Sequence, residues 1–438
     1  MADAPFGIRG LLLDTPERGK LRARRDGAII VKEGCIAAAG DFSDLQKIEP
    51  GLTWRHGEDA VIFPGLIDLH SHVPQYPAVA RGQTELLPWL QRYIFPLERE
   101  FTGEKARSES ARFFAELARH GTTTAMLYST IFEESCDLVF EAARAAGQRA
   151  VIGKVMMDIG SYGKLPVEKI AAVSIEESER LCKKWHGAND GLLDYAVSPR
   201  FAVSCSRELM AGAGSLAKAH SAYIQTHLSE NLAELARVRE LHPWAENYTD
   251  VYAKCGLLGE RTVLAHGVHL SEGELEVLAS TRSTIAHCPS ANLFLGSGIM
   301  PLGETWDAGV RVVLGTDVAA GPELNLWQVM RSAIESQKAR ASFEKNVRVP
   351  SPAELLFLAT QGAADALGKG DALGSLDAGK EADLTIIKAS ALLPYREDSS
   401  TREELESEDI LSLCVYRGSA RATAETLVRG RTIYRATF

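Results

Sequence analysis

In the middle of the chain, apolar residues follow two different patterns. Short apolar runs, typical of buried strands, alternate with longer stretches in which apolar residues recur every three or four positions, as in amphipathic helices. Strands are predicted at residues 66–70, 122–128, 150–156, 194–198, 223–227, 262–266, 284–287 and 310–315. Helices are predicted between them, among others at residues 106–120, 133–146, 168–185 and 272–280.

This succession of eight strand–helix units indicates the architecture of the middle region. It is typical of an α/β fold, a (β/α)8 TIM barrel, with a doubly wound open sheet as the alternative. After the barrel, Ser351-Pro352-Ala353-Glu354 predicts a capped helix that continues over residues 355–367. Residues 74–102, which follow the first strand, are too many for a simple loop and are expected to shape a pocket or lid.

The two ends of the chain share a strand-rich pattern that differs from the middle. Residues 28–31 and 35–40 predict a hairpin with Gly34 at its turn, and residues 382–387 and 426–434 predict further strands. We expect both ends to meet in one small composite β-sandwich domain. The predicted division is residues 1–62 and 371–438 for that domain and residues 63–370 for the barrel.

Composition and charge narrow the classes of protein to which the chain can belong. Of its 438 residues, 45% are hydrophobic and 24% are charged, as in a globular protein with a large core. A net charge of −10 without a basic patch argues against nucleic acid and anionic membranes as partners. No apolar run reaches the roughly 18 residues of a spanning helix, and the first residues lack a signal-peptide pattern. Seven cysteines without a Cys-x-x-Cys pair are typical of a reducing compartment, so a cytoplasmic protein is expected.

A His-x-His pair closes the first predicted strand of the barrel. In Asp68-Leu69-His70-Ser71-His72 the two histidines are two positions apart, and such residues point to the same side of a strand. Alone, the pair is more often a surface or core feature than a metal site. Active sites of barrels lie at the carboxyl ends of the strands. Further polar residues at these ends are His227, His266, His287 and Asp317.

These strand-end residues suit one divalent metal ion. Zn2+ and Fe2+ both accept imidazole nitrogen and carboxylate oxygen, and a catalytic site keeps one position for water. The predicted ligands are His70, His72, His227 and Asp317. A two-metal barrel would carry a bridging lysine at the end of the fourth strand, and residues 196–201 contain none. We therefore expect one divalent metal ion, Zn2+ in the first place and Fe2+ as the alternative.

Two further residues are candidates for handling protons beside the metal. Glu230, three positions after His227, can carry protons between water and substrate, or can be an acid that stabilises a helix N-terminus. His266 is placed to hold or polarise the attacking water. The roles of His269 and His287 stay open. His287 suits a pocket wall as well as a core position.

The same residues carry a resemblance to a known family. Residues 64–72, together with His227, His266 and Gly315-Thr316-Asp317, resemble the amidohydrolase superfamily. Residues 374–376 and 379–384 are similar to its C-terminal signature. Within the superfamily, segments such as Pro74-Gln75-Tyr76-Pro77 and Ser198-Pro199-Arg200-Phe201 look like the guanine deaminase family, although Ala291 stands where serine is usual.

This resemblance implies the hydrolytic deamination of guanine to xanthine and ammonia by a homodimer. Asp317 would take a proton from the water, Glu230 would protonate a ring nitrogen and help ammonia to leave, and His266 would stabilise the adduct. The residues implied at the purine are Gln75, Arg200, Phe201, His227, Glu230 and Asp317. A related aminohydrolase acting on 8-oxoguanine, a triazine or an adenosine derivative is the alternative. A non-catalytic scaffold is disfavoured, because it would be expected to lack some of these groups.

Overall fold

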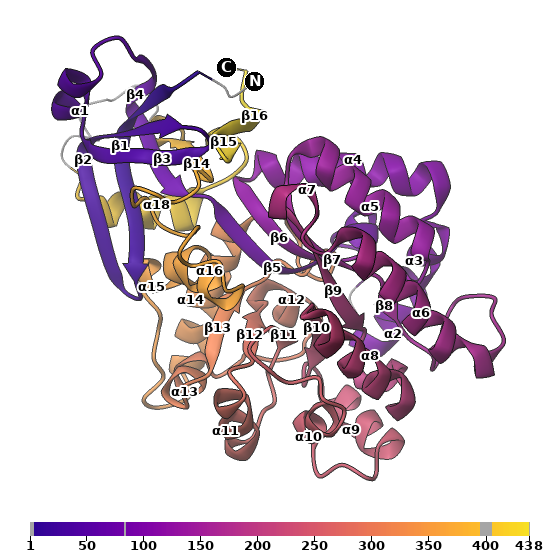
Figure 1. The fold of residues 1–438 in the computed structure, drawn as a ribbon. Coiled ribbons are helices and arrows are strands. Elements are labelled where there is room, and N and C mark those ends of the chain that lie inside the picture. Colours follow the sequence, from indigo (N-terminus) through magenta and orange to yellow (C-terminus); the bar gives the residue numbers. More distant parts are fainter. Residues whose placement is uncertain (1–3, 83–84, 395–404, 438) are drawn as a thin grey trace.

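A computed structural model describes residues 4–82, 85–394 and 405–437 as a barrel that carries a separate sheet (Figure 1). A few residues of the predicted segments lie outside the described part. They are residues 1–3, 395–404 and 438 of the two end segments and residues 83–84 of the predicted pocket segment. Among the described residues, no helix combines the length and the apolar character that crossing a membrane requires.

The barrel consists of parallel strands that pair in the order of the chain. They are β5 (Leu66–His72), β6 (Thr122–Tyr128), β7 (Arg149–Gly153), β9 (Leu193–Pro199), β10 (Tyr223–Leu228), β11 (Thr262–His266), β12 (Thr284–His287) and β13 (Arg311–Leu314). The last strand returns to the first, where the Asp317 amide donates to the His70 carbonyl at 2.8 Å. The TIM-barrel prediction is confirmed, and the open-sheet alternative is wrong.

One predicted strand is divided in the structure. The prediction for residues 150–156 runs through Lys154, but β7 ends at Gly153 and a short β8 (Val155–Met156) follows it. The buried Lys154 ammonium donates to the Ile131 carbonyl and to Ser174 and lies 3.2 Å from Glu177. The interruption thus coincides with a buried lysine whose partners lie outside the barrel wall.

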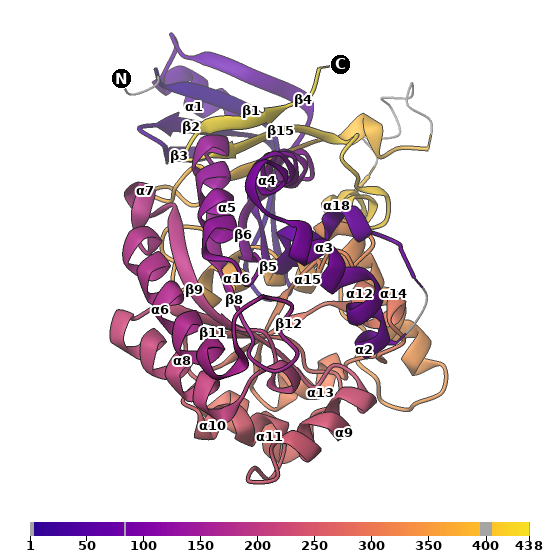
Figure 2. The same ribbon diagram turned by 90° about the vertical axis from the view of Figure 1, so that its right-hand side faces the viewer.

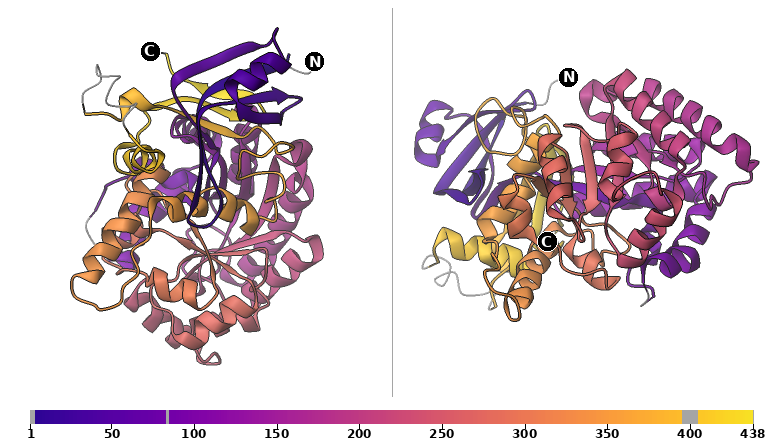
Figure 3. Two further views of the ribbon diagram at one scale, coloured as in Figure 1. Left: turned by 90° about the vertical axis from the view of Figure 1, so that its left-hand side faces the viewer. Right: turned by 90° about the horizontal axis from the view of Figure 1, so that it is seen from below.

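Helices surround the barrel on the outside (Figures 2 and 3). The main ones are α4 (Gly103–Arg119), α5 (Glu133–Ala146), α6 (Val167–Trp185), α8 (Arg207–His220), α9 (Leu232–Leu241), α10 (Tyr248–Lys254), α11 (Glu272–Ser280), α12 (Pro289–Phe294), α13 (Leu302–Asp307) and α14 (Leu326–Ala341). Capping boxes start α11 at Ser271 and α15 (Pro352–Leu358) at Ser351, as the sequence predicts. The single helix predicted for residues 355–367 is wrong, since Thr360 has a non-helical backbone and a separate helix α16 (Gln361–Ala366) begins after it.

The barrel interior is filled by side chains at alternating strand positions. Apolar residues from all eight strands form one buried cluster: Ile67, Leu69, Met126, Val151, Ala196, Tyr223, Val263, Ala286 and Val313. The same cluster includes Ala363, Ala364 and Leu367 from α16 and the residue that follows it. α16 therefore closes one end of the barrel, and the polar strand ends lie at the opposite end.

The two ends of the chain meet in one mixed sheet, drawn at the top of Figure 2. Its strands are β1 (Phe6–Glu17), β2 (Lys20–Lys32), β3 (Cys35–Asp41), β4 (Thr53–Pro64), β14 (Leu384–Lys388), β15 (Thr423–Val428) and β16 (Arg431–Arg435). β4 lies between β1 and β14, so N-terminal and C-terminal strands are directly bonded. In the described part of the two ends, the strands are interrupted by the helices α1 (Phe42–Ile48) and α18 (Ser407–Arg417) and by the short helix η4 (Ala389–Ala391). The domain boundaries at residues 62 and 370 stay a prediction.

The long segment after β5 forms a series of short helices. They are η1 (Val73–Ala78), α2 (Leu86–Trp89), η2 (Leu90–Ile94) and α3 (Phe95–Glu100). Its apolar residues Trp89, Ile94 and Phe95 belong to a buried cluster that also contains Tyr128 and Phe201. The segment is thereby packed against the strand ends, where it can form one wall of a site.

Candidate active site

A β-bulge at the end of β5 directs its two histidines into the barrel. Asp68 pairs with Ala125 of β6, and Ser71 pairs with Leu127, so two residues of β5 oppose one residue of β6. An extra residue of this kind reverses which side chains face inward, and such bulges are frequent next to active sites. His72 consequently stands beside the inward-facing Tyr128 and stacks on it with ring centroids 4.6 Å apart.

The predicted metal ligands converge on one point. His70 Nε2 lies 3.2 Å from Asp317 Oδ1, and His72 Nε2 lies 3.4 Å from the same oxygen. His72 Nε2 is also 3.2 Å from His227 Nε2. Potential ligand atoms of His70, His227, His266 and Asp317 all lie within 4.8 Å of one another. Five groups are thus available for one ion, with His266 in addition to the four predicted ones.

The protonation and hydrogen bonding of these side chains suit the binding of a divalent cation. Burial lowers the pKa of His70, His72 and His227 well below the ordinary value, so the rings are neutral, as metal ligands must be. His227 Nδ1 lies 2.6 Å from the Arg200 carbonyl, which orients the ring and leaves Nε2 for the ion. The buried Nε2 of His70 has no hydrogen-bond partner among the described residues, which a metal would supply.

Asp68 and Thr316 hold the first and last strands of the barrel together at the site. The buried Asp68 carboxylate accepts from the His70 amide at 3.2 Å, from the Thr316 amide at 3.0 Å and from the Thr316 hydroxyl at 2.6 Å. Burial raises the pKa of Asp68 to about 7, and the hydrogen bonds from Thr316 oppose that rise. This brace fixes the backbone that carries His70 and Asp317. Neither brace residue was predicted as part of the site.

Glu230 points into the site and does not cap a helix. The helix after it, α9, begins at Leu232 with Asn231 as its cap and Glu234 as the partner of its capping box. Glu230 Oε2 lies 3.4 Å from His266 Nε2, and Oε1 accepts from Ser297 Oγ at 3.0 Å. Burial raises the pKa of Glu230 to about 7, so its carboxyl can gain or lose a proton near neutral pH.

His266 is held between an amide and two carboxylates. Its Nδ1 lies 2.9 Å from Asn292 Oδ1, and its Nε2 lies 3.9 Å from Asp317 Oδ2. Burial lowers the pKa of His266, but Glu230 and Asp317 outweigh it, and the pKa lies above the ordinary value. The backbone at His266 and Asp317 is left-handed, with φ of 77° and 48°, a conformation rare for residues other than glycine. These turns aim both side chains back across the end of the barrel.

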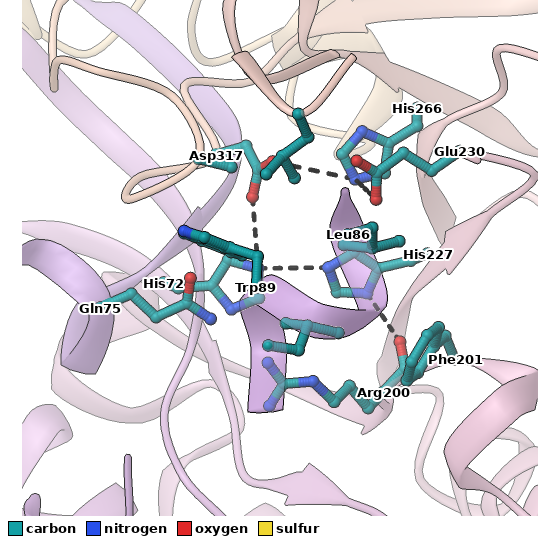
Figure 4. A pocket seen from close by; sticks show the side chains of 13 residues that line it. His72, Gln75, Leu86, Trp89, Arg200, Phe201, His227, Glu230, His266 and Asp317 are labelled. Carbon is teal, nitrogen blue, oxygen red and sulfur yellow. Dashed lines mark hydrogen bonds and ion pairs between the residues drawn. The ribbon is translucent and has the colours of Figure 1, made fainter. Parts of the chain in front are cut away.

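A cavity with about 370 Å³ of empty volume joins this polar cluster to an apolar wall (Figure 4). The wall consists of Leu86, Trp89 and Leu90 from the segment after β5, together with Leu295 and Phe201. The segment at residues 74–102 therefore shapes the pocket, as predicted. Other predicted site residues that line the cavity are His72, Gln75, Arg200, His227, Glu230, His266 and Asp317.

Two predicted site residues, Gln75 and Arg200, are joined by Glu98, which was not predicted as part of the site. The Gln75 amide nitrogen donates to Glu98 Oε1 at 2.9 Å, and Arg200 Nη1 donates to Glu98 Oε2 at 2.6 Å. All three side chains are at most 2% exposed. Glu98 belongs to α3, 102 positions before Arg200 in the chain.

The two histidines whose roles were open lie beside the site. His269 Nε2 is 2.7 Å from the carbonyl of Ser297, the residue whose hydroxyl binds Glu230. His287 is buried, and its two ring nitrogens have no hydrogen-bond partner among the described residues. Burial lowers the pKa of His287 to about 3, so its ring is neutral. Neither histidine is among the residues that line the cavity.

The barrel with its attached sheet is typical of one class of hydrolases. In this class a cluster of histidines and an aspartate at the strand ends suits a divalent metal ion. Residues 61–433 match the amidohydrolase family, and the chain belongs to this family. The resemblance stated from the sequence is therefore confirmed.

Similar proteins of this family share almost the whole chain. A guanine deaminase of Escherichia coli K12 is 37% identical over 429 residues, which cover 96% of this chain and 94% of the relative. The solved E. coli guanine deaminase superimposes with a TM-score of 0.91, at 34% identity, over 99% of this chain and all of that one. A guanine deaminase from C. acetobutylicum with guanine bound in its active site gives 0.90, at 32% identity, over 98% of this chain and all of that one.

Proposed function

We propose that the protein hydrolyses guanine to xanthine and ammonia. The proposal rests on one cavity. Its lining includes the histidine–aspartate cluster and the buried acid Glu230, and also Arg200 and Gln75, whose side chains can form hydrogen bonds with a purine. The guanine deaminases to which this chain is similar, among them one named with guanine in its active site, support the choice of substrate. No specific feature of the cavity favours 8-oxoguanine, a triazine or an adenosine derivative instead.

One divalent metal ion is proposed at the end of the barrel. His70, His72, His227 and Asp317 are proposed to hold it, and His266 lies close enough to be a fifth partner. When bound, such an ion makes water a nucleophile at neutral pH. Zn2+ and Fe2+ both accept imidazole nitrogen and carboxylate oxygen, and Zn2+ is proposed as the occupant with Fe2+ as the alternative.

The proton transfers are assigned to Asp317, Glu230 and His266. Asp317 accepts the proton of the attacking water, since its carboxylate lies 3.2 Å from His70 and 3.9 Å from His266, the residue assigned to hold that water. Glu230 protonates a ring nitrogen of the purine, which its pKa of about 7 permits at neutral pH. The proton that Asp317 took from the water then goes to the 2-amino group, which leaves as ammonia, while Glu230 regains a proton from the hydroxyl of the adduct. His266 holds the water and, being flanked by two carboxylates, stabilises charge on the tetrahedral adduct.

Purine recognition is assigned to the opposite side of the cavity. Arg200 has a rigid set of N–H donors that suits the O6 and N7 acceptors of guanine. Gln75 contributes an amide, and Phe201 contributes an apolar surface beside His227. The centroid of the Phe201 ring lies 6.3 Å from that of His227, so a purine placed near this surface also lies near the metal cluster.

The direct test incubates metal-loaded protein with guanine and measures ammonia and xanthine. Release of both in equal amounts is expected, whereas the absence of both at micromolar enzyme would refute the proposal. A panel of 8-oxoguanine, triazines and adenosine derivatives, compared by kcat/KM, tests the substrate. Guanine should give the highest value.

A cytoplasmic homodimer is proposed as the working form. All seven cysteines are free thiols in the structure, six of them buried, which suits a reducing compartment. Sedimentation equilibrium on the metal-loaded protein, with a dimer mass expected, tests the oligomeric state.

A further inference from the structure

Glu98 is a buried carboxylate whose two oxygens contact two different residues of the proposed purine site. Oε1 accepts from Gln75 Nε2 at 2.9 Å, and Oε2 accepts from Arg200 Nη1 at 2.6 Å. Its side chain, in α3, is fully buried. Glu98 therefore lies behind the recognition groups and does not line the cavity itself.

The first consequence concerns the orientation of the Gln75 amide. An amide can in general rotate to present either its oxygen or its NH2 group to a ligand. An ionised carboxylate only accepts hydrogen bonds, so the Gln75 nitrogen must face Glu98, and Oε1 must face away from it. Rotation would place two acceptor oxygens against each other in a buried site, which is costly. Figure 4 shows the Gln75 nitrogen on the same side as the Arg200 guanidinium.

The second consequence concerns charge. Arg200 is a permanent cation, is 2% exposed and stacks over the Phe95 ring at 4.9 Å. Without a counter-charge, a buried guanidinium would favour anionic ligands. The ion pair with Glu98 neutralises it and leaves the remaining donors of its fork in place. The cavity thus presents a fixed donor, Arg200, beside a fixed acceptor, Gln75 Oε1, with little net charge.

We propose that Glu98 is a positioning residue that makes the pocket selective for 6-oxopurines over 6-aminopurines, a proposal that rests on the proposed function. A 6-oxopurine carries an acceptor, C6=O, beside a donor, N1–H, which complements Arg200 and Gln75 Oε1. A 6-aminopurine carries the reverse pair, so its amino group meets a donor and its N1 meets an acceptor. Sites with buried polar groups reject such mismatched ligands strongly.

The test compares guanine with 2,6-diaminopurine in the wild type and in Glu98→Gln. Both purines carry the 2-amino group that leaves, so the same bond is broken. Glutamine at position 98 can donate or accept, which frees the Gln75 amide to rotate and removes the counter-charge. We expect the ratio of kcat/KM for guanine to that for 2,6-diaminopurine to fall at least about tenfold. The change should lie mainly in KM for guanine. The Ki of 2,6-diaminopurine against guanine turnover should fall as well.

Matched variants separate positioning from a structural role. Glu98→Asp keeps the carboxylate and should retain most of the discrimination. Glu100→Gln, in the same helix, removes an exposed acid paired with Lys105 and should change neither substrate. If kcat/KM in Glu98→Gln falls by the same factor for both purines, or does not fall at all, the ratio is unchanged and the proposal is overturned.

A second variant keeps the test decisive if Glu98→Gln does not fold. Gln75→Leu removes the acceptor oxygen while Glu98 and Arg200 stay paired, and the same ratio should fall at least about tenfold. An unchanged ratio would again overturn the proposal. The proposed function is judged separately, because it fails only if the wild type releases no ammonia from guanine.

Discussion

At the scale of single residues, Glu230 is the group on which the proposed proton transfers depend. Replacement by glutamine keeps the size and the hydrogen bond from Ser297 but removes the ionisable proton. We expect Glu230→Gln to retain the metal and to lose about 10²–10⁴-fold in kcat. Elemental analysis and the guanine assay on the same sample check this. Unchanged turnover would assign the proton transfers to another residue.

His227 is expected to behave differently, because it is assigned to the metal itself. Its Nδ1 is fixed by the Arg200 carbonyl, so Nε2 has one direction available to it. His227→Ala should lower the bound metal to a small fraction of one equivalent and abolish turnover. His220→Ala is the matched control, since that histidine contacts Glu179 on the outside of the barrel and should leave the metal content unchanged.

At the scale of elements, the sequence predicted the helices and strands whose apolar residues follow a regular period. It did not predict the places where the backbone is irregular. His227, His266 and Asp317 were predicted because each follows an apolar strand. The bulge at residues 69–70, the left-handed backbone at His266 and the break at Lys154 leave no periodic signal. Glu98 was missed for another reason. A glutamate in a short helix is usually exposed, and only the folded chain brings it to Gln75 and Arg200.

The segment after β5 also carries a prediction at this scale. Trp89 lines the cavity, is 2% exposed and donates through Nε1 to the Arg81 carbonyl at 2.9 Å. Trp89→Ala removes an aromatic wall from the purine site and should raise KM for guanine about tenfold, with a smaller effect on kcat. Trp54→Ala, in β4 of the small sheet, is the control and should leave KM for guanine unchanged. A lower KM in Trp89→Ala would contradict a binding role.

A buried carboxylate in the small sheet predicts a pH dependence of stability. The Glu425 carboxylate in β15 is bound by His56, Thr432 and Arg435. Burial alone would raise its pKa, but these partners outweigh burial and lower it to about 2. A lowered pKa means that the ionised group stabilises the fold above its unfolded pKa of roughly 4.3. That contribution disappears as the pH falls from there towards 2.

Glu425→Gln should therefore reduce the free energy of unfolding by about 2 kcal/mol at pH 7. The difference from the wild type should shrink steadily between about pH 4 and pH 2. Urea unfolding at several pH values measures both curves. A difference that stays constant down to pH 2 would show that lost packing, and not the charge of Glu425, is responsible.

At the scale of the whole molecule, the eight-strand barrel and the shared sheet of the two ends followed from the sequence. Each depends on a pattern repeated over many residues, so single errors such as the helix break at Thr360 did not change the topology. The site is different, because its geometry depends on a few residues from distant segments. Five of the groups at the metal cluster could be named in advance, but the bridge from Glu98 and the brace from Asp68 could not.

The position of β4 between β1 and β14 has a consequence for how the chain is made. β4 is synthesised early, and its partner β14 leaves the ribosome more than 300 residues later. Until then one edge of β4 is open, and open edges pair readily with other chains. The nascent barrel lies directly downstream of this unfinished sheet. Protection of that edge during translation, by a chaperone or by the growing barrel itself, is therefore a requirement of this topology.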